Sequence, residues 1–499
     1  MKETHMRIRN TETLTNHGNR TIRKDVAAIL DAGMTAGDPY GNTLKLVRVE
    51  NGSLLVGGTD YEPFDTPRPG IVAMDLATTG RIFVFGAGKG IQRVAEALED
   101  TLGDRIAGGH ILVKYGDNTK LSRIGVTYGG HPIPDENCVK GCEIMVRKIR
   151  EAQLTPEDLV FTIVGNGVSS LMTLPAEGLS LQSIMDLTRV LQIEKGAPTR
   201  DLNAVRNSID QLKGGRITRM LRPARMFHLL TIDCNTGMSG KHGYAGLTET
   251  NIWLHTLPDA TSGEEALNVL RRFDAWDEVA DEVKTFLQTM TPEQDTLKKD
   301  EFERMDCRIY GVVPDHLSVM AASFAKSEEL GYTPYLLNKR VFDLDAAESA
   351  KFLGHMAMLV EQEDTPFKAP CALFMAGEKV VRVGKGGGIG GRNQEFCVSI
   401  AAVIAGTGRI GVGSVDTDGT DGPGGDFDPE AKRLGVMALA GGLVDGTSWS
   451  RAEELGYNLT DALLTHDTSK PLWDMGDGVW AVHSISVQDL TVVLVGAGK

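Results

Sequence analysis

The sequence predicts an α/β protein of two domains. Short apolar runs alternate with helical patterns through most of its 499 residues, which favours a parallel sheet with helices on both faces. The chain is too long for one ordinary hydrophobic core. A charged stretch with few large apolar runs, 274–304, separates two such patterns. We therefore expect an N-terminal domain over residues 20–300 and a C-terminal domain over 301–499.

The first pattern supplies the elements of the N-terminal domain. Apolar runs predict buried strands over 81–86, 110–115, 124–128, 159–164 and 227–232. Helical spacing of apolar residues predicts helices over 91–102, 135–152, 181–193 and 202–212. Asp135 is a suitable N-cap for the second of these helices because its side chain can accept from the first free N–H groups.

The second pattern supplies the elements of the C-terminal domain. Strands are expected over 307–313, 334–337, 371–376, 379–383, 409–415 and 490–495. Helices are expected over 315–330, 345–362 and 393–406. The runs 371–376 and 379–383 predict a hairpin that turns at Gly377 and Glu378.

A glycine-rich loop precedes the helix predicted from Asn393. Six of the eight residues in 384–391 are glycine, which no packed core requires. Exposed backbone N–H groups, a helix N-terminus and Arg392 at the junction together suit a phosphate or a carboxylate. A flexible connection between two elements is the alternative.

Lys89 lies in the turn Gly86-Ala87-Gly88-Lys89-Gly90, between a predicted strand and a predicted helix. The turn resembles a dinucleotide fingerprint but lacks its third glycine and its later acidic residue. A lysine at the carboxyl edge of a sheet can neutralise a phosphoryl group during transfer. A solvated turn lysine is the alternative.

Three further segments could bind an anion or orient a substrate. Gly165–Ser170 follows a strand with backbone donors and two hydroxyls. His131 is held in the rigid turn His131-Pro132-Ile133-Pro134. Segment 203–216 places several side-chain donors within about four helical turns, namely Asn203, Arg206, Lys213 and Arg216. An ordinary turn, a capping turn and a solvated helix face are the respective alternatives.

An acidic loop follows the strand predicted over 409–415. Asp416, Asp418 and Asp421 place three carboxylates within six residues. Because packed carboxylates repel, a positive partner is expected, and Mg²⁺ with nucleotide phosphates is the usual one. One carboxylate could instead act as a general base on a substrate hydroxyl. A plain acidic turn is the alternative.

Bulk properties exclude several classes of protein. The net charge of −15 argues against nucleic-acid binding. No apolar stretch approaches the roughly 20 residues of a membrane helix, and the polar residues 1–19 are no secretory signal. Six scattered cysteines indicate reduced thiols and a cytoplasmic protein. The oligomeric state stays open, with a homodimer among the options.

Taken together, these motifs resemble the MOFRL-type (class II) glycerate 2-kinase family from about Arg23 to the C-terminus. The resemblance rests on DAGMTAGDPY at Asp31, GAGKG around Lys89, GGHPIPDE at Gly129, NAVRNSIDQLKGGR at Asn203, GGRNQE at Gly390 and DTDGTDGPG at Asp416. GGRNQE and the aspartate loop together are the most specific.

The resemblance implies the fold and the chemistry. It implies an N-terminal Rossmann-like α/β/α sandwich, a C-terminal MOFRL-type α/β domain and an active site in the cleft between them. It implies phosphoryl transfer from ATP, with Mg²⁺, to the 2-hydroxyl of glycerate, so a small hydroxy acid and a nucleotide are the expected partners. The family's characteristic lysine and arginine fall on Lys89 and Arg392.

We assign site residues on this basis. Lys89, Arg392 and Asp416 are expected to be catalytic, and Asp418 and Asp421 to bind the metal, although the division of roles among the three aspartates stays open. The residues expected to bind the cofactor are Gly386, Gly387, Gly388, Gly390, Gly391, Asn393, Glu395 and Ser169.

Three loops depart from the family's pattern. They are 165–169 (family G-G-G-x-S), 232–236 (family S-D-V-x-G-D) and 482–489 (family G-P-T-G-T-N-V-N-D). These departures predict a retained phosphoryl-transfer frame with a changed acceptor pocket. Two other functions are kept as alternatives, a non-catalytic binder of a sugar acid or nucleotide and an NAD(P)H-dependent hydroxypyruvate reductase.

Overall fold

The chain divides into two compact units in a computed structural model, which describes residues 6–131, 133–235, 242–383, 387–425, 429–485 and 487–498. The N-terminal unit is Pro39–Pro314, and the C-terminal unit joins Met1–Asp38 to Asp315–Lys499. The expected division, 20–300 and 301–499, differs from this one. The first helices belong to the C-terminal unit. The chain returns to that unit at Asp315, after the charged stretch 274–304 and not within it.

The N-terminal unit contains a six-stranded parallel sheet. Its strands are β4 (Ile82–Ala87), β5 (Ile106–Lys114), β6 (Gly125–Gly129), β7 (Leu159–Val164), β8 (Arg225–Leu230) and β9 (Cys307–Gly311). Their order across the sheet is β6-β5-β4-β7-β8-β9. This is the doubly wound Rossmann order, in which the direction of winding reverses between the first and fourth strands of the sheet, here β4 and β7. The expected Rossmann-like architecture is confirmed.

Helices and a small sheet surround these strands. Every residue of β4 and of β7 is buried, so both faces of the sheet are covered. The flanking helices are α3 (Pro39–Leu46), α4 (Gln92–Leu102), α5 (Glu136–Ala152), α6 (Val168–Leu171), α9 (Arg216–Met220), α10 (Gly243–Glu249) and α13 (Lys299–Phe302). Asp135 caps α5 as expected, accepting from the Cys138 N–H.

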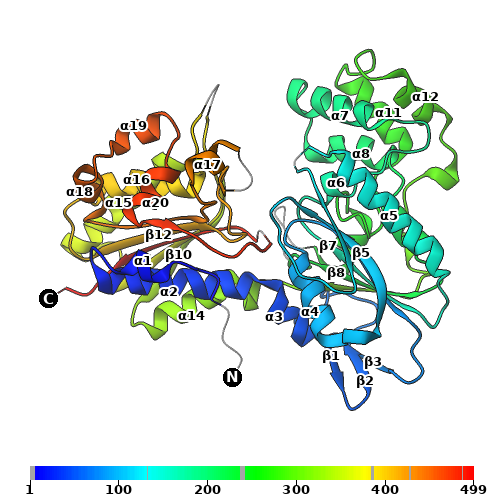
Figure 1. Cartoon of the computed structure of the whole chain (residues 1–499), viewed down its shortest axis with the longest axis horizontal. Coiled ribbons are helices and arrows are strands. Elements are labelled where there is room, and N and C mark those ends of the chain that lie inside the picture. The colour runs from blue at the N-terminus through cyan, green and yellow to red at the C-terminus, as the bar shows by residue number, and fades with distance from the viewer. Residues whose placement is uncertain are drawn as a thin grey trace. The chain divides into compact units, whose positions relative to one another are not determined.

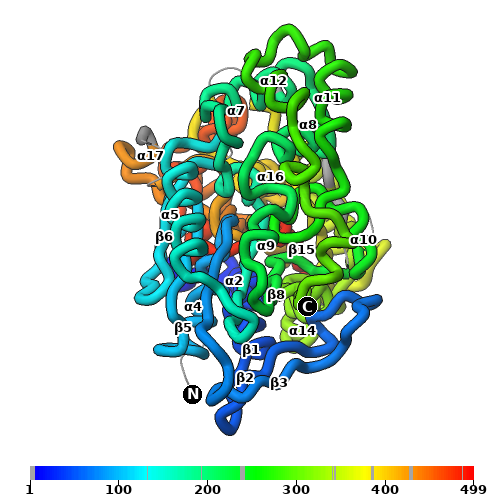
Figure 2. The backbone as a smooth tube through the Cα atoms, turned by 90° about the vertical axis from the view of Figure 1, so that its right-hand side faces the viewer, coloured from blue at the N-terminus to red at the C-terminus, as the bar shows by residue number. Residues whose placement is uncertain are grey.

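The two ends of this unit differ in structure (Figure 2). An antiparallel sheet of β1 (Val47–Glu50), β2 (Ser53–Val56) and β3 (Val72–Asp75) lies at one end. At the other end, helices with their own apolar core gather, namely α7 (Leu181–Thr188), α8 (Thr199–Ser208), α11 (Gly263–Arg272) and α12 (Asp281–Thr289). The end of α8 brings polar side chains from this helical layer toward the turn after β7.

The C-terminal unit contains a mixed six-stranded sheet. Its strands are β10 (Thr333–Asp345), β11 (Cys371–Val380), β12 (Ile410–Asp416), β13 (Gly441–Asp445), β14 (Gly478–Val479) and β15 (Asp489–Val495). Their order is β10-β11-β15-β12-β13-β14, and only β10 and β11 pair in parallel. β12 and β15 are antiparallel neighbours at the centre of the sheet, so the end of one lies beside the start of the other.

Helices cover both faces of this sheet (Figure 1). On one face lie α1 (Thr11–Thr15), α2 (Arg20–Gly37) and α14 (Val319–Glu329). On the other lie α15 (Ala346–Glu363), α16 (Arg392–Val403), α18 (Ser448–Glu454), α19 (Leu459–Leu464) and α20 (Ser469–Met475). The short α17 is Pro429–Leu434. Each face therefore has a separate apolar core.

The first helices belong to this unit because α2 carries an apolar stripe and a buried cation. Gly411 of β12 leaves room for Ile22, since a Cβ at that glycine would come within 2.9 Å of the isoleucine side chain. Arg23 is fully buried and donates to the Leu14 carbonyl at 2.6 Å and to Asp477 at 2.5 Å. A buried arginine needs such partners, and they come from both ends of the chain.

The hairpin expected at Gly377 and Glu378 is wrong. β11 runs unbroken from Cys371 to Val380 and pairs with β10 on one side and β15 on the other. Gly377 serves close packing rather than a turn, because a Cβ there would lie 2.4 Å from the backbone nitrogen of Val341 in β10. The other predicted strands and helices are present in the expected order, with ends displaced by a few residues, except that the strand predicted over 334–337 continues to Asp345. The strands β1, β2, β3, β13 and β14 were not predicted.

Two further expectations concern membranes and thiols. No helix among the described residues is long and apolar enough to cross a membrane. All six cysteines are described, unpaired and buried, so the prediction of reduced thiols is confirmed.

Candidate functional site

Lys89 lies where the winding of the N-terminal sheet reverses. It follows β4, and its backbone N–H donates to the Asn166 carbonyl after β7 at 2.8 Å. The next residue, Gly90, donates its N–H to the buried carboxylate of Asp117 at 2.9 Å. The crevice at this switch point is where open α/β sheets bind ligands. Lys89 therefore occupies the place expected of a ligand-facing lysine.

His131 approaches the same turn. Gly167, with φ of +79°, lies beside both side chains, since a Cβ on it would come within 2.9 Å of Lys89 Cγ and 3.0 Å of His131 Cδ2. Only glycine fits this backbone conformation and this space without strain. The turns after β4, β6 and β7 thus bring Lys89, His131 and Gly167 together.

Ser169 lies on the first turn of α6 and contacts a histidine that the sequence analysis missed. Its Oγ is 2.9 Å from His255 Nε2. Its carbonyl accepts from Arg206 Nη2 at 2.8 Å. Burial, followed by the charges of Lys213 and Arg206, lowers the pKa of His255 well below its usual value, so this imidazole is neutral.

The basic residues of segment 203–216 separate into two groups. Lys213 donates to Asp210 at 2.6 Å and to Thr173 at 2.9 Å, and Arg216 donates to backbone carbonyls, among them that of Gln294. These two residues are structural. Arg206 contacts the turn that contains Ser169 through one hydrogen bond, and Arg206 Nε and Asn203 Oδ1 have no partner.

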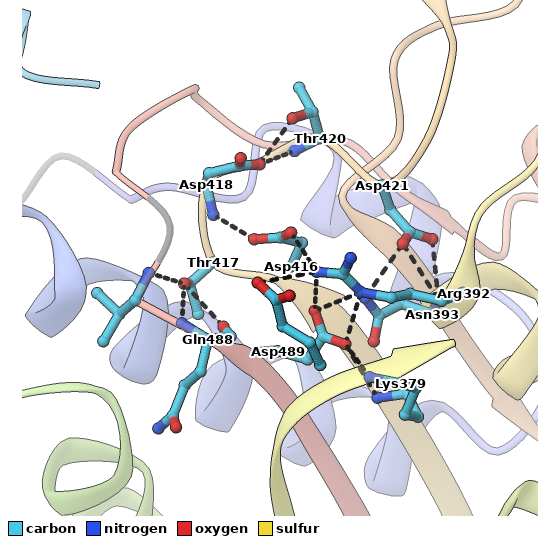
Figure 3. Close-up of polar contacts among 12 residues, drawn as sticks. Lys379, Arg392, Asn393, Asp416, Thr417, Asp418, Thr420, Asp421, Gln488 and Asp489 are labelled. Carbon is cyan, nitrogen blue, oxygen red and sulfur yellow. Dashed lines mark hydrogen bonds and ion pairs between the residues drawn. The ribbon is translucent and has the colours of Figure 1, made fainter. Parts of the chain in front are cut away.

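In the C-terminal unit, Arg392 joins two aspartates (Figure 3). Its Nη2 lies 2.9 Å from Asp416 Oδ2, and its Nε lies 2.9 Å from Asp489 Oδ2. Asp416 ends β12 and Asp489 begins β15, and the two are direct cross-strand partners. Like charges in that position repel, so the guanidinium supplies the compensation that the acidic loop was expected to need.

The electrostatics of this cluster follow from burial. Burial, together with the charges of Asp418 and Asp489, raises the pKa of Asp416 well above its usual value. Burial alone would lower the pKa of Arg392, but the charges of Asp489, Asp416 and Asp421 outweigh it and raise that pKa. Arg392 therefore stays a cation.

Asp489 and Lys379 complete the cluster, and neither was selected from the sequence. Lys379 is buried, with its Nζ 3.5 Å from Asp489 Oδ2 and 3.0 Å from Thr491 Oγ1. Asp489 is bound by two cations through both oxygens, as Figure 3 shows. The sequence offered two signals for Asp489, its place before the apolar run 490–495 and the family pattern of the loop 482–489, which also ends in Asp.

Asp421 caps α16. Its carboxylate accepts from the backbone N–H groups of Asn393 at 3.0 Å and Gln394 at 2.9 Å, and from Asn393 Nδ2 at 3.2 Å. Gly391 permits this approach, because a Cβ there would lie 2.4 Å from Asp421 Oδ2. The helix N-terminus that was expected to hold a phosphate thus donates to this side chain, and a metal-binding role of Asp421 stays a prediction.

The described part of the glycine loop keeps some backbone donors available. Gly388 donates to the Thr465 carbonyl at 2.8 Å, and Ile389 donates to Asp467 at 3.2 Å. The N–H groups of Gly387, Gly390 and Gly391 donate to no group that the structure describes. Gly386, also expected to bind the cofactor, lies outside the described residues.

Glu395 and Asn393 are directed into the protein. Glu395 Oε1 lies 2.8 Å from His466 Nδ1, and the glutamate is 5% exposed. Asn393 is fully buried, and its Oδ1 accepts from Ser414 Oγ at 2.7 Å. These two residues support the glycine loop and the acidic loop, so a direct contact with the cofactor stays a prediction.

Comparisons with known proteins match this architecture. The MOFRL family model matches residues 371–484, and a model described as a domain of unknown function (DUF4147) matches 25–239. The chain is 28% identical over 457 residues to the glycerate 2-kinase of Pyrococcus horikoshii, covering 91% of this chain and 93% of that protein. It is 31% identical over 399 residues to the D-glycerate 2-kinase of Thermotoga maritima, covering 79% and 86%. The chain belongs to the MOFRL-type glycerate 2-kinase family.

Solved structures of similar proteins share the fold of this family member. A crystal structure of a glycerate kinase from Thermotoga maritima matches with a TM-score of 0.71 at 26% identity, covering 95% of this chain and 99% of that one. A structure of a protein from Pyrococcus horikoshii matches with a TM-score of 0.69 at 25% identity, covering 96% and 99%.

The acidic loop of this glycerate 2-kinase family member can be compared with two kinds of metal site. It suits Mg²⁺ bound together with a nucleotide better than a metal held by protein side chains alone. Among the described residues, no group of three or more His, Cys, Asp or Glu side chains could hold a metal ion. Mg²⁺ in nucleotide enzymes usually takes one or two carboxylates and completes its shell with waters and phosphates. Asp418 lies close enough to Asp416 for its charge to raise the pKa of Asp416.

Two of the loops that depart from the family pattern support this site. The Ser484 N–H donates to the Asp418 carbonyl at 2.9 Å, so the loop at 482–485 lies against the acidic loop. Asn235 Nδ2 donates to the Glu62 carbonyl at 2.9 Å and so holds the loop at 232–235 to a neighbouring segment. Residues 236–241 lie outside the described part of the chain.

Replacing Asp421 with asparagine is expected to remove a pH dependence of stability. Burial and the charge of Asp489 raise the pKa of Asp421 to about 6, above the unfolded value of about 3.9. The folded state then binds more protons between these values, so stability falls as the pH rises from about 4 to about 6. Wild type should lose about 3 kcal/mol relative to Asp421→Asn across this window.

Thermal or urea unfolding of both proteins at several pH values between 4 and 7 measures this difference. Titration of other groups cancels in the comparison. A difference that stays constant with pH would show that Asp421 is ionised throughout the range.

Proposed function

We propose that this chain is an ATP- and Mg²⁺-dependent kinase that phosphorylates a hydroxyl of glycerate or a related small hydroxy acid. The observation that carries this proposal is the buried cluster in which Arg392 compensates Asp416 and Asp489 beside an open glycine loop. Phosphoryl transfer depends on positioning and on charge compensation of this kind. The names of the two relatives described above support the same reaction.

The C-terminal unit supplies the donor half of the proposed site. Arg392 Nη1 makes no hydrogen bond with any described residue, and the side chain is 27% exposed. It can therefore contact a phosphate while Nε and Nη2 hold the aspartates. The N–H groups of Gly387, Gly390 and Gly391, with Gly386 and Gly388 beside them, would contact the phosphates. Asp418 would hold Mg²⁺, which neutralises phosphate charge when bound.

The N-terminal unit supplies the acceptor half. Lys89 at the switch point would stabilise the charge of the transferring phosphoryl group. Ser169 on the neighbouring turn would contact the hydroxy acid or the nucleotide.

Asp416 would take the proton of the attacking hydroxyl. Its Oδ1 accepts from the Asp418 N–H at 3.0 Å and its Oδ2 accepts from Arg392, so both oxygens are held in position. Burial raises the pKa of Asp416 above its usual value, which increases its basicity as a general base requires.

A reductase is the second candidate function. The Rossmann strand order favours it, because that order is shared with dinucleotide-binding domains. The Gly86–Gly90 turn lacks the glycine pattern of such domains, and Lys89 occupies the position near which a pyrophosphate would lie.

One pair of assays separates these functions. The purified protein is mixed with glycerate, ATP and MgCl₂, and ADP release is followed by a coupled assay with and without EDTA. In parallel, NADH and NADPH absorbance is followed with hydroxypyruvate. The proposal predicts glycerate-dependent ADP release that EDTA abolishes and no oxidation of either coenzyme. Oxidation without ADP release would establish the reductase.

We also infer a cytoplasmic location, which the unpaired state of all six thiols supports.

A further inference from the structure

Arg206 is a buried cation without a carboxylate partner. It is 9% exposed, and its one hydrogen bond runs from Nη2 to the Ser169 carbonyl at 2.8 Å. Its Nε has no partner, and no described carboxylate forms an ion pair with it. Burial lowers its pKa to about 10. Keeping an unpaired charge buried is costly, which indicates that a partner is supplied from outside the chain.

Among the described residues, most of the other buried cations have a carboxylate partner, and Arg216 donates instead to several backbone carbonyls. Arg23 has Asp477 and Asp445 within 3.5 Å, Lys213 has Asp210 at 2.6 Å, and Lys379 has Asp489 at 3.5 Å. Arg206 lies in the last turn of α8. The nearby Asp210 forms no ion pair with it, because Asp210 is bound by Lys213 and by backbone N–H groups.

Two neighbouring groups also lack partners. Asn203 is 1% exposed, its Oδ1 has no hydrogen bond, and it lies one turn before Arg206 on the same face of α8. His255 Nδ1 is buried without a partner, while Nε2 is 2.9 Å from Ser169 Oγ. An unsatisfied buried N–H is rarer than an unsatisfied acceptor, and two cations lie nearby. The hydrogen of neutral His255 therefore belongs on Nε2, and Ser169 Oγ accepts it.

This tautomer leaves the Ser169 hydroxyl hydrogen available to a ligand. We propose that Arg206, Asn203 and Ser169 form a subsite for the carboxylate of a small hydroxy acid, with His255 as the positioning residue for Ser169. Arg206 and Ser169 donate to the carboxylate, and the Asn203 amide suits the adjacent hydroxyl. This inference rests on the proposed function for its substrate class, but the subsite can be tested without turnover.

Binding of glycerate without nucleotide tests the subsite. Isothermal titration compares wild type with Arg206→Met, and glycerol serves as a probe that lacks the carboxylate. Loss of a buried charged contact is expected to weaken glycerate binding at least about 30-fold. The control is Arg200→Met, which removes a half-exposed arginine of the same helix that pairs with Glu265 at 3.5 Å. This control should bind glycerate as wild type does, and glycerol should bind to none of the proteins.

Thermal unfolding separates a ligand-binding role from a structural one. Because Arg206→Met removes an unpaired buried charge, its Tm in the absence of ligand should equal or exceed that of wild type. A fall in Tm of more than a few degrees, or glycerate affinity within about threefold of wild type, would overturn the inference. If glycerate binding depends on Arg206 but the protein releases no ADP, the kinase proposal is overturned and the subsite is retained.

His255 is tested by rescue. His255→Phe is expected to raise the Kd for glycerate about tenfold, since the Ser169 hydroxyl is no longer oriented. His255→Gln, whose amide can still donate to Ser169, should recover most of this loss. Equal weakening in both variants would show that His255 acts through packing, and the positioning role would be withdrawn.

Discussion

Replacing Arg392 with methionine is expected to lower kcat/KM at least about 10³-fold and to destabilise the C-terminal unit. The guanidinium compensates Asp416 and Asp489, which are cross-strand partners, and offers Nη1 to a ligand. Without it, Asp416 loses its ion-pair partner and Asp489 keeps only Lys379, which costs about 3–5 kcal/mol. The structure thus predicts a loss of stability together with the loss of turnover.

A second substitution separates the two effects. In Arg392→Met combined with Asp489→Asn, the unpaired charge is reduced, so stability should recover while turnover stays low. Arg382→Met removes an exposed arginine near the end of the neighbouring strand and is the matched control. Steady-state kinetics and unfolding of the four proteins measure both quantities. An Arg392→Met enzyme with more than a tenth of wild-type activity would contradict the assigned role.

Lys89→Met is expected to lower kcat about 10³-fold while leaving the fold and the KM values within a few-fold of wild type. The lysine lies half-buried at the switch point, where its charge can act on the transferring phosphoryl group. Such an interaction is strongest in the transition state, so it affects kcat more than KM.

Lys120→Met is the control for Lys89, because Lys120 is exposed and follows the adjacent strand β5. Initial rates at varied ATP and glycerate, with circular dichroism spectra of each variant, give the comparison. Unchanged kcat in Lys89→Met would remove Lys89 from the mechanism. A raised KM for one substrate with normal kcat would assign it to binding alone.

Much of the fold could be predicted because burial requires apolar residues at regular positions in the local sequence. Continuous apolar runs such as 159–164 indicate strands covered on both faces. The helix predicted over 135–152 begins at Asp135, a residue type that commonly caps helices. The hairpin at Gly377 failed because glycine has two uses. It can turn a chain, or it can let a neighbouring backbone approach closely, as Val341 does here.

The site residues that lie close together in the sequence could be predicted. Those that meet only in the folded chain could not. The acidic loop and the glycine loop are local motifs, and both lie in the C-terminal unit. Asp489 joins Arg392 across 97 residues, and His255 joins Ser169 across 86. Asp421 was assigned to a metal because three nearby aspartates suggest a cation, and the fold shows in addition that Asp421 caps a helix N-terminus. Only the folded chain shows which carboxylate is already engaged.

The central claim is that the protein transfers the γ-phosphoryl group of ATP to a hydroxyl of a small hydroxy acid. ³¹P NMR of a reaction containing ATP, MgCl₂ and glycerate tests this claim directly. The account predicts that the γ-phosphate resonance declines while a phosphomonoester resonance and the resonances of ADP grow in equal amounts. Growth of ADP and inorganic phosphate without a phosphomonoester, or an unchanged ATP spectrum, would contradict it.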